Sequence, residues 1–581
     1  MRSFLKIFFA SFLAIALFTL IAVLIMAGIV GSLASKEKTR VDDRSVLVID
    51  LSNTFHEHMQ VNPLAALTNE GDVPGLYDVI RLIAHAKTDK NISGIYLKAG
   101  FNGNGFASSH ELRNAITDFR TSRKFVIAHA DIMTQEAYFI ASAADKVYVN
   151  PAGSFDWRGF SVTLAFIKEL LAKLDIEPQI FYAGKFKSAT EMFRTSQMTP
   201  ENREQTIAWL GDLYDHFLVQ AAASRGVDTA TLHRLANTAA ISTPQDAVNY
   251  KLIDGVRYDD EIKTDIKQRL GKERTDKLGF ININKYHEAV NVRKTGTNRI
   301  AIIYAEGNIV DGMGGSDNIG GDHFREIIRK ARLDNSVKAI VLRVNSGGGS
   351  ALASENIWRE LQMAKADKKP VVVSFGDVAA SGGYYIACGA DSIFASPNTI
   401  TGSIGVFGIV PNMQGFFKNK LGITFDGVKT GQYADAGIHR PLNEAEKKQV
   451  QEGVEKIYSL FLQRVASGRK KDTTYIDSIA QGRVWSGMDA IRIGLVDRMG
   501  SLQDAINSAA KLAGISEYGT REYPEKKTWV DELLGRNKVE PSAMIKEQLG
   551  EEYYKVYLEL MRVKEMSTGV QARLPFEFVI R

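Results

Sequence analysis

The sequence predicts an α/β protein in which one βαβ module occurs twice in tandem, preceded by a single amino-terminal transmembrane helix. Three observations lead to this prediction: four segments recur in the same order, apolar strand-like runs alternate with amphipathic helices, and the chain opens with a long apolar run free of charge. The length of 581 residues leaves room for three to five domains at about 150 residues each. A composition of 45% hydrophobic and 24% charged residues is that of a globular protein.

The transmembrane prediction rests on the segment from Ile7 to Ala34, which contains no charged residue. About 20 apolar residues in a helix cross a bilayer core of roughly 30 Å, whereas the apolar core of a cleaved signal peptide is usually about 7–15 residues long. We therefore predict an anchor that is not cleaved. Basic residues flank both ends of the run, so counting them does not assign its sides. The short segment before it favours a cytoplasmic amino terminus and an exported body.

The net charge excludes one large class of proteins. The whole chain carries +5, and residues 1–40 hold five basic residues against one acidic residue, which leaves about +1 for the remaining 541 residues. A protein body that binds nucleic acid normally shows a basic excess, so we predict no nucleic-acid partner. The single cysteine, Cys388, excludes an intrachain disulfide and any metal site built from several cysteines.

The internal repeat is read from four pairs of segments at nearly one offset. Matches in the same order, at an offset of 254 residues for the first pair and of 243 to 246 for the other three, are hard to obtain by chance, so the chain is predicted to contain a tandem duplication. The pairs are Ser45–Leu51 with Arg299–Ala305, Ile92–Lys98 with Val337–Arg343, Ala137–Asp145 with Gly383–Asp391, and Asp246–Asp254 with Asp489–Asp497.

Each copy reads as strand, helix, strand, helix, strand, helix. In the second copy, the apolar runs Ala339–Val344 and Pro370–Phe375 flank Glu355–Ala366, which has helical periodicity. This alternation is typical of βαβ units around a buried parallel sheet. A longer helical hairpin is expected in each copy at about 201–225 and 444–469, and a charged linker over 263–297. The predicted domains are the anchor 1–40, the first repeat 41–290, the second repeat 296–520 and a mostly helical tail 521–581.

A glycine-rich turn follows the strand at Ala339–Val344 of the second copy. The sequence NSGGGS at 345–350 exposes backbone N–H groups that could bind a phosphate or a developing oxyanion. No Gly-Lys-Ser/Thr follows, and the spacing is not G-x-G-x-x-G, so the nucleotide-binding interpretations fail. Taken by itself, the turn is weak evidence for such a site, and a tight structural turn is its default explanation.

A second turn places Ser381 between small residues, where a strand passes into an apolar helix. Such a position suits a nucleophile whose attack creates an oxyanion, and it also suits a helix N-cap. The first copy has Gln135 and Glu136 at the positions of Ser381 and Gly382. Because a purely structural cap would be expected in both copies, this difference favours the nucleophile.

A nucleophilic serine needs a base, and the histidines do not supply an obvious one. His56, His58, His129 and His439 lie in no catalytic motif and are better explained as structural or surface residues. A lysine whose pKa is lowered by burial is the other route. The sequence GKFKSA at 184–189 follows an apolar strand of the first copy, and its counterpart in the second copy has no lysine. A solvated edge remains the alternative for these lysines.

Together these motifs resemble the signal peptide peptidase family SppA, of the membrane-anchored protease IV type. The resemblance extends over the anchor, both repeats and the tail, and it implies the superhelical βαβ module that Clp proteases and crotonases also use. The motifs are DVAASGGYY around Ser381, RVNSGGGS at 343–350, TGSIGV at Thr401–Val406 and GKFKSATEMF at 184–193.

The resemblance implies a serine–lysine dyad divided between the repeats. Ser381 would be the nucleophile and Lys187 the general base, with Lys185 the less favoured lysine. Ser403 would position the lysine amine. The two residues of the dyad are 194 positions apart, so the repeats must face each other within one chain or between subunits.

The same resemblance implies backbone oxyanion donors. These would be the N–H groups of Gly382 and of either Gly348 or Gly349. Gly347 stands where the family often has proline, and this departure leaves the choice between Gly348 and Gly349 open.

The implied activity is hydrolysis of peptide bonds in cleaved signal peptides and other apolar peptides, with no metal or cofactor. A homotetramer is implied, held in the bacterial inner membrane by a single span with the catalytic body on the periplasmic side. Two alternatives remain at this stage: an acyl-CoA enzyme of the crotonase type, and a membrane scaffold without catalytic activity.

Overall fold

The computed structural model describes residues 8–9, 11–21, 40–59, 72–315, 317–525 and 569–574. Residues 11–21 are helical and exposed. Within the described ranges, no helix combines the length and the apolar character needed to cross a bilayer. Most of the predicted span Ile7–Ala34 lies outside the described residues.

The first repeat is built on a six-stranded sheet with the order β6-β4-β3-β2-β1-β7. Every strand pair in this sheet is parallel. Helices α3 (Leu76–Thr88), α4 (Phe106–Arg120) and α5 (Gln135–Ala141) connect the strands. The strands are β1 (Ser45–Asp50), β2 (Ile92–Lys98), β3 (Phe125–Met133), β4 (Lys146–Phe155), β6 (Gly255–Val256) and β7 (Phe280–Asn282).

The second repeat has the same strand order. Its sheet runs β17-β15-β13-β11-β8-β19, with β14 beside β13 and β18 beside β14, so β8, β11 and β13 take the places of β1, β2 and β3. The α/β class and the parallel sheets are confirmed; in the second sheet only the β15–β17 pair is antiparallel. The strands are β8 (Arg299–Glu306), β11 (Val337–Ser346), β13 (Val371–Ala380), β14 (Ser392–Ala395), β15 (Ile400–Gly402), β17 (Val484–Ser486), β18 (Arg498–Met499) and β19 (Gly519–Tyr523).

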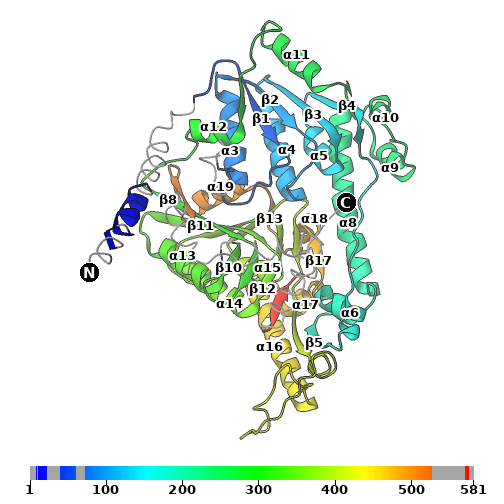
Figure 1. Ribbon diagram of the computed structural model, residues 1–581, viewed down its shortest axis with the longest axis vertical. Coiled ribbons are helices and arrows are strands. Elements are labelled where there is room, and N and C mark those ends of the chain that lie inside the picture. The colour runs from blue at the N-terminus through cyan, green and yellow to red at the C-terminus, as the bar shows by residue number, and fades with distance from the viewer. Residues whose placement is uncertain are drawn as a thin grey trace.

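The helices of the second repeat also repeat those of the first. Helices α8 and α16 each have 26 residues and occupy the two ranges in which a hairpin was expected. Each range is one continuous helix, so the helical character is confirmed and the hairpin is wrong. Figure 1 shows α8 running along one side of the molecule, from the first repeat down past the second. The helices are α8 (Pro200–Arg225), α9 (Thr229–Asn237), α10 (Pro244–Asn249) and α11 (Asp259–Arg269) in the first repeat, and α13 (Gly321–Leu333), α14 (Ala351–Ala366), α15 (Gly382–Ala387), α16 (Glu444–Arg469), α17 (Thr473–Ile479), α18 (Gly487–Arg492) and α19 (Leu502–Leu512) in the second.

A third sheet joins the two repeats and positions the candidate site. Its order is β10-β9-β12-β20-β16-β5, in which only β5 (Glu177–Ala183) comes from the first repeat. Strand β5 pairs antiparallel with β16 (Val406–Asn412), from Val406 opposite Ala183 to Asn412 opposite Glu177. The remaining strands are β9 (Asn308–Val310), β10 (Asn318–Gly320), β12 (Gly348–Ser350) and β20 (Gln571–Arg573). In Figure 1 the red strand β20 lies beside β12, among the elements of the second repeat.

Buried charges also hold the repeats together. Arg343 on β11 is 1% exposed, and its guanidinium donates to Glu57 at 2.8 Å and to Glu111 at 2.7 Å, both from the first repeat. It also donates to Ser374 Oγ at 2.9 Å. Removing one member of such a group would leave an uncompensated buried charge, so these contacts specify how the repeats dock.

One expectation about the connecting segments needs correction, and the described residues test a second one only in small part. The predicted linker 263–297 carries part of α11, β7 and α12 (Ile283–Ala289), and β7 pairs with β1 at the edge of the first sheet. The predicted helical tail contains strands where it is described: β19 pairs with β8, and β20 pairs with β12 and β16. In each case the segment pairs with an open edge of a sheet, whose backbone groups accept a further strand. The polar composition of the segment does not indicate that such an edge lies nearby. Residues 526–568 lie outside the described part.

Candidate active site

Ser381 sits at the junction between β13 and α15, in a backbone conformation that is uncommon for a residue with a side chain. Its φ is 55° and its ψ is −116°, and the residue is fully buried. Its N–H donates to Gly402 O at 2.8 Å, which fixes the turn. A strained strand-to-helix turn of this kind directs a serine hydroxyl away from the helix backbone.

The side chain of Ser381 does not cap α15, so the N-cap interpretation of this residue is wrong. In the first copy the neighbouring Thr134 does cap its helix, by accepting the N–H of Ala137. Gln135 there turns its side chain away and accepts the N–H groups of Arg158 and Gly159. The same strand-to-helix turn occurs in both copies. Only the second copy has a serine at this position, and the hydroxyl of that serine does not cap the helix.

Lys187 reaches Ser381 from the loop that follows β5. The loop is held by the N–H of Phe186, which donates to Gln481 O at 2.8 Å. Lys187 is 1% exposed, and its Nζ lies 2.9 Å from the Oγ of Ser381. The structure therefore brings the two residues together within one chain, across a separation of 194 positions.

Ser403 completes the surroundings of the amine. The Nζ of Lys187 lies 3.0 Å from the Oγ of Ser403 and 3.2 Å from its carbonyl oxygen. Ser403 is fully buried with a φ of 49°, and its N–H donates to Arg483 O at 2.7 Å. The amine is thus held by oxygens on a rigid turn, aimed at Ser381.

Burial lowers the pKa of Lys187 well below its ordinary value, because the charged form loses its hydration. A neutral amine has a lone pair that can accept the hydroxyl proton of Ser381. Lys185, two positions earlier, is exposed, and its Nζ lies 4.9 Å from the centre of the Phe186 ring. The geometry therefore separates the two lysines, and only Lys187 can act on Ser381.

The glycine turns meet beside Ser381 and hold a backbone carbonyl from the carboxy-terminal strand. A Cβ on Gly348 would lie 2.0 Å from Ala572 O, and one on Gly382 would lie 2.9 Å from the same oxygen. Gly348 has a φ of +97°, which a side chain rarely permits. Because the carbonyl oxygen of Ala572 approaches this closely, neither Gly348 nor Gly382 has room for a side chain.

The hydrogen-bond pattern separates Gly348 from Gly349. The N–H of Gly348 donates to Ser346 Oγ at 3.1 Å and is therefore already used. Gly349 lies opposite Ala572 in the antiparallel pairing of β12 with β20. In an antiparallel ladder, residue pairs that exchange backbone hydrogen bonds alternate with pairs that do not. Leu574 N–H donates to Gly347 O on one side, so the Gly349–Ala572 pair is the next hydrogen-bonded one.

The histidines take no part in this arrangement. His56 Nδ1 lies 3.1 Å from Glu306, His129 Nε2 lies 3.1 Å from the carbonyl of Arg257, and the ring of His439 packs on Phe425. Across the described ranges, no group of three or more histidine, cysteine or acidic side chains could hold a metal ion.

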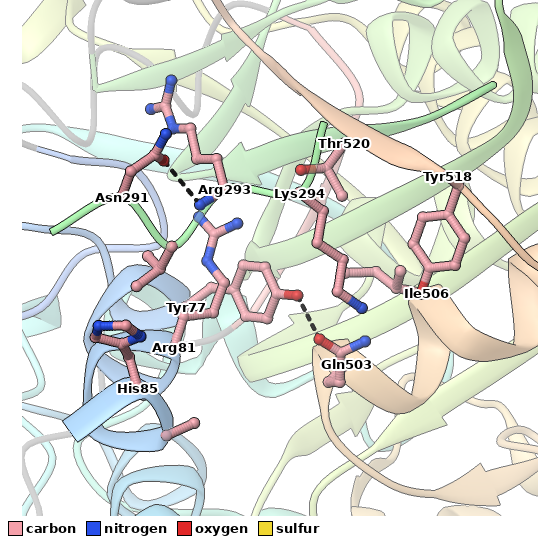
Figure 2. Close-up of a pocket in the computed structure, with 12 residues that line it drawn as sticks. Tyr77, Arg81, His85, Asn291, Arg293, Lys294, Gln503, Ile506, Tyr518 and Thr520 are labelled. Atoms are coloured by element: carbon pink, nitrogen blue, oxygen red, sulfur yellow. Dashed lines mark hydrogen bonds between the residues drawn. The ribbon is translucent and has the colours of Figure 1, made fainter. Parts of the chain in front are cut away.

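A separate cavity lies between the repeats, away from the residues discussed above. Figure 2 shows Tyr77 of α3 facing Gln503 of α19, while Arg81 of α3 points toward Asn291 and Arg293. The hydroxyl of Tyr77 donates to Gln503 at 2.6 Å. Neither Ser381 nor Lys187 lines this cavity, so it is not part of the candidate active site.

Two segments of the chain, residues 118–273 and 363–516, match the family model described as "Peptidase family S49". The chain belongs to peptidase family S49. One match falls in each repeat, in agreement with the duplication.

Three relatives support this assignment and name an activity. "Protease 4" of Salmonella typhi is 34% identical over 92% of this chain and 89% of the relative, and "Protease 4" of Haemophilus influenzae is 35% identical over 84% and 83%. "Serine protease SPPA, chloroplastic" of Arabidopsis thaliana is 32% identical over 74% of this chain and 64% of the relative. The resemblance seen in the motifs is confirmed, and the chain is a serine protease.

Some residues that shape the site could not be found from the sequence. Gln205 on α8 donates to Phe186 O at 3.2 Å and to Ser188 Oγ at 2.9 Å, while its side-chain oxygen accepts the N–H of Val484 at 3.0 Å. It therefore clamps the lysine loop to the second repeat. A single glutamine on a long helix carries no sequence signal for this role, because its partners come from distant segments.

Proposed function

We propose that the chain is an endopeptidase that uses Ser381 as nucleophile and Lys187 as general base and acid. The observation that carries this proposal is the distance of 2.9 Å between Lys187 Nζ and Ser381 Oγ, with both residues buried. A nucleophile and base within hydrogen-bond reach, with the base oriented by a third group, is the arrangement that activated serines require. Ser403 is the third group in this proposal.

The reaction follows from the positions of these groups. Neutral Lys187 takes the hydroxyl proton as Ser381 Oγ attacks the substrate carbonyl carbon, and the ammonium then protonates the leaving amine. Water, deprotonated by the same lysine, hydrolyses the ester and returns the proton to Ser381. The oxyanion is stabilised by the N–H groups of Gly382 and Gly349, with Gly348 allowing close approach.

The substrate would bind as an extended strand between β12 and β16. This place in the third sheet offers backbone partners on both sides, as its pairing with β20 illustrates. We propose apolar peptides, including cleaved signal peptides, as the substrate class. The support is the resemblance of the motifs to the SppA family and the names of the relatives.

We further propose that the apolar run Ile7–Ala34 anchors the enzyme in the bacterial inner membrane, with the catalytic body on the periplasmic side. Support comes from the length of the charge-free run. We also propose that each repeat has the module of Clp proteases and crotonases, on the evidence of its parallel sheet. The two glycine turns of the second repeat add to this support.

We propose a homotetramer, the assembly that the resemblance to the SppA family implies. An unequal use of equivalent segments in the two repeats supports a contact between copies. By the repeat offset, residues 160–166 correspond to β16 and residues 424–430 to β5, yet neither segment is a strand in the described chain. Residues 160–164 alternate apolar and polar side chains as a strand would, and Phe425 and Val428 are exposed. Pairing 424–430 of one copy with 160–166 of the next would repeat the β5–β16 junction between copies, a head-to-tail contact of the kind from which rings are built.

Two measurements test these proposals. Purified protein is incubated with a synthetic signal peptide, and the fragments are read by mass spectrometry for wild type and Ser381→Ala. Cleavage by the wild type only supports the function, and equal cleavage by both contradicts it. For assembly, light scattering is compared for wild type and Phe425→Asp: a tetramer that dissociates in the variant is expected, and a monomeric wild type would refute the ring.

A further inference from the structure

The described end of the chain, Val570–Leu574, lies in the proposed substrate position. Its strand β20 pairs antiparallel with β12 and contacts β16 through Gln571 opposite Phe407. The ladder extends at both ends, since Leu574 N–H donates to Gly347 O at 2.7 Å and Ala351 N–H donates to Val570 O at 3.3 Å. This segment is held by backbone bonds, as a bound peptide would be.

Burial shows that the segment fills a shaped groove. Ala572 is fully buried, Gln571 and Leu574 are each 7% exposed, and Arg573 is 9% exposed. Ala572 belongs to the main core of the second repeat. Leu574 packs with Trp209 and Val484 in a smaller cluster. The groove therefore accepts a methyl side chain at one position and an apolar side chain two positions later.

One carbonyl of this segment stands out by its position. Ala572 O lies against Gly348 and Gly382, at 2.0 and 2.9 Å from the Cβ positions that these glycines lack. Gly382 directly follows Ser381, and Gly349 is the ladder partner of Ala572. Among the bonds of Val570–Leu574, the Ala572–Arg573 bond is therefore the one whose carbonyl lies in the proposed oxyanion site.

We propose that the enzyme cleaves its own chain at the Ala572–Arg573 bond. This inference rests on the proposed serine–lysine function. Ser381 Oγ bonds to the carbonyl carbon of Ala572 as its proton passes to Lys187, and the bond from carbon to the nitrogen of Arg573 breaks with that nitrogen taking the proton. Water then hydrolyses the ester. The products are a chain ending at Ala572 and the nine-residue peptide RLPFEFVIR.

The groove also defines which residue the enzyme accepts before a cleaved bond. Ala572 has no exposed surface, so a larger side chain at this position has no room without displacing the strand. We therefore expect a small residue on the carbonyl side of the bond, both in self-cleavage and in external peptides.

Intact-mass spectrometry of the full-length protein tests the proposal. The wild type is expected to lose residues 573–581 and release RLPFEFVIR, while Ser381→Ala keeps its full carboxy terminus. Ala572→Trp is expected to slow this cleavage at least 100-fold. Ala230→Trp adds the same bulk at an exposed alanine of α9 and is expected to behave as wild type.

Hydrolysis of an external synthetic peptide in the same samples separates the two proposals. A wild type that cleaves the peptide but retains residues 573–581 overturns self-cleavage and leaves the protease function standing. Cleavage of the tail at another bond, or unchanged cleavage in Ala572→Trp, also overturns it. A wild type that cleaves neither substrate refutes the proposed function itself.

Discussion

Replacing Lys187 with methionine isolates the proposed base from the packing around it. Methionine has a similar length and keeps apolar contacts along the buried stem, but it has no amine. The variant loses the group 2.9 Å from Ser381 Oγ while Ser381 and the glycine turns stay in place. Lys187→Met is therefore expected to fold and to lose hydrolysis.

The size of the loss follows from the burial of the site. General base catalysis contributes about 10²–10⁴-fold to a rate. Because Lys187 is 1% exposed and fills the space beside Ser381, bulk water has no access to replace it. We expect the upper end, a fall of about 10⁴ in kcat/KM, which corresponds to about 5.5 kcal/mol of transition-state stabilisation.

The assay is hydrolysis of a fluorogenic peptide with alanine before the scissile bond. Lys185→Met is the matched control, because it changes the same residue type two positions away on an exposed side chain. The control is expected to keep nearly full activity. Activity above about one tenth of wild type in Lys187→Met, or an equal loss in Lys185→Met, would refute the assignment of the base.

Stability provides an independent check on the same substitution. Burial lowers the pKa of Lys187 in the folded protein, so the unfolded chain binds more protons than the folded one between the two pKa values. The free energy of unfolding therefore decreases as the pH falls from 10.5, the ordinary pKa of lysine, toward the lowered pKa of Lys187 in the folded protein. At pH 7 the unfolding midpoint of Lys187→Met is expected to match or exceed that of wild type, and this advantage shrinks as the pH rises toward 10.5.

Three further predictions follow from the same geometry. The kcat/KM of wild type is expected to rise with pH through the lowered pKa of Lys187 and to level off well below pH 10.5, and a rise centred near 10.5 would contradict this. Ser403→Ala removes an oxygen 3.0 Å from Nζ and is expected to lower kcat about 10–100-fold with KM little changed, as steady-state kinetics can check. Burial raises the pKa of Glu57 to about 7 despite the neighbouring Arg343. Between pH 4.5 and 7 the folded protein therefore keeps a proton on Glu57 that the unfolded chain loses. The free energy of unfolding is expected to fall by about 3 kcal/mol as the pH rises through this range. Denaturant unfolding across this range is expected to show a flatter profile in Glu57→Gln.

The sequence by itself determined the duplicated α/β architecture, the serine turn and the resemblance to a serine–lysine protease. These features are local: strands and helices follow from apolar periodicity, and glycine turns follow from the backbone freedom that they require. The comparison of the two copies singled out Ser381 and the lysine loop, since each is present in only one copy. The sequence could not choose between Gly348 and Gly349, and without the family resemblance it could not choose between Lys185 and Lys187.

Tertiary structure supports one candidate in each case, because these choices depend on contacts between distant segments. The pairing of β5 with β16 brings Lys187 to Ser381 and leaves Lys185 in solvent. Ser346 occupies the N–H of Gly348, which leaves Gly349 to face the carbonyl in the groove. The strand at 571–573 was unexpected, because its polar sequence context favours a helix and its partners lie more than 160 positions away. A strand that completes an open sheet edge is stabilised by backbone bonds to that edge, and local sequence does not encode where the edge lies.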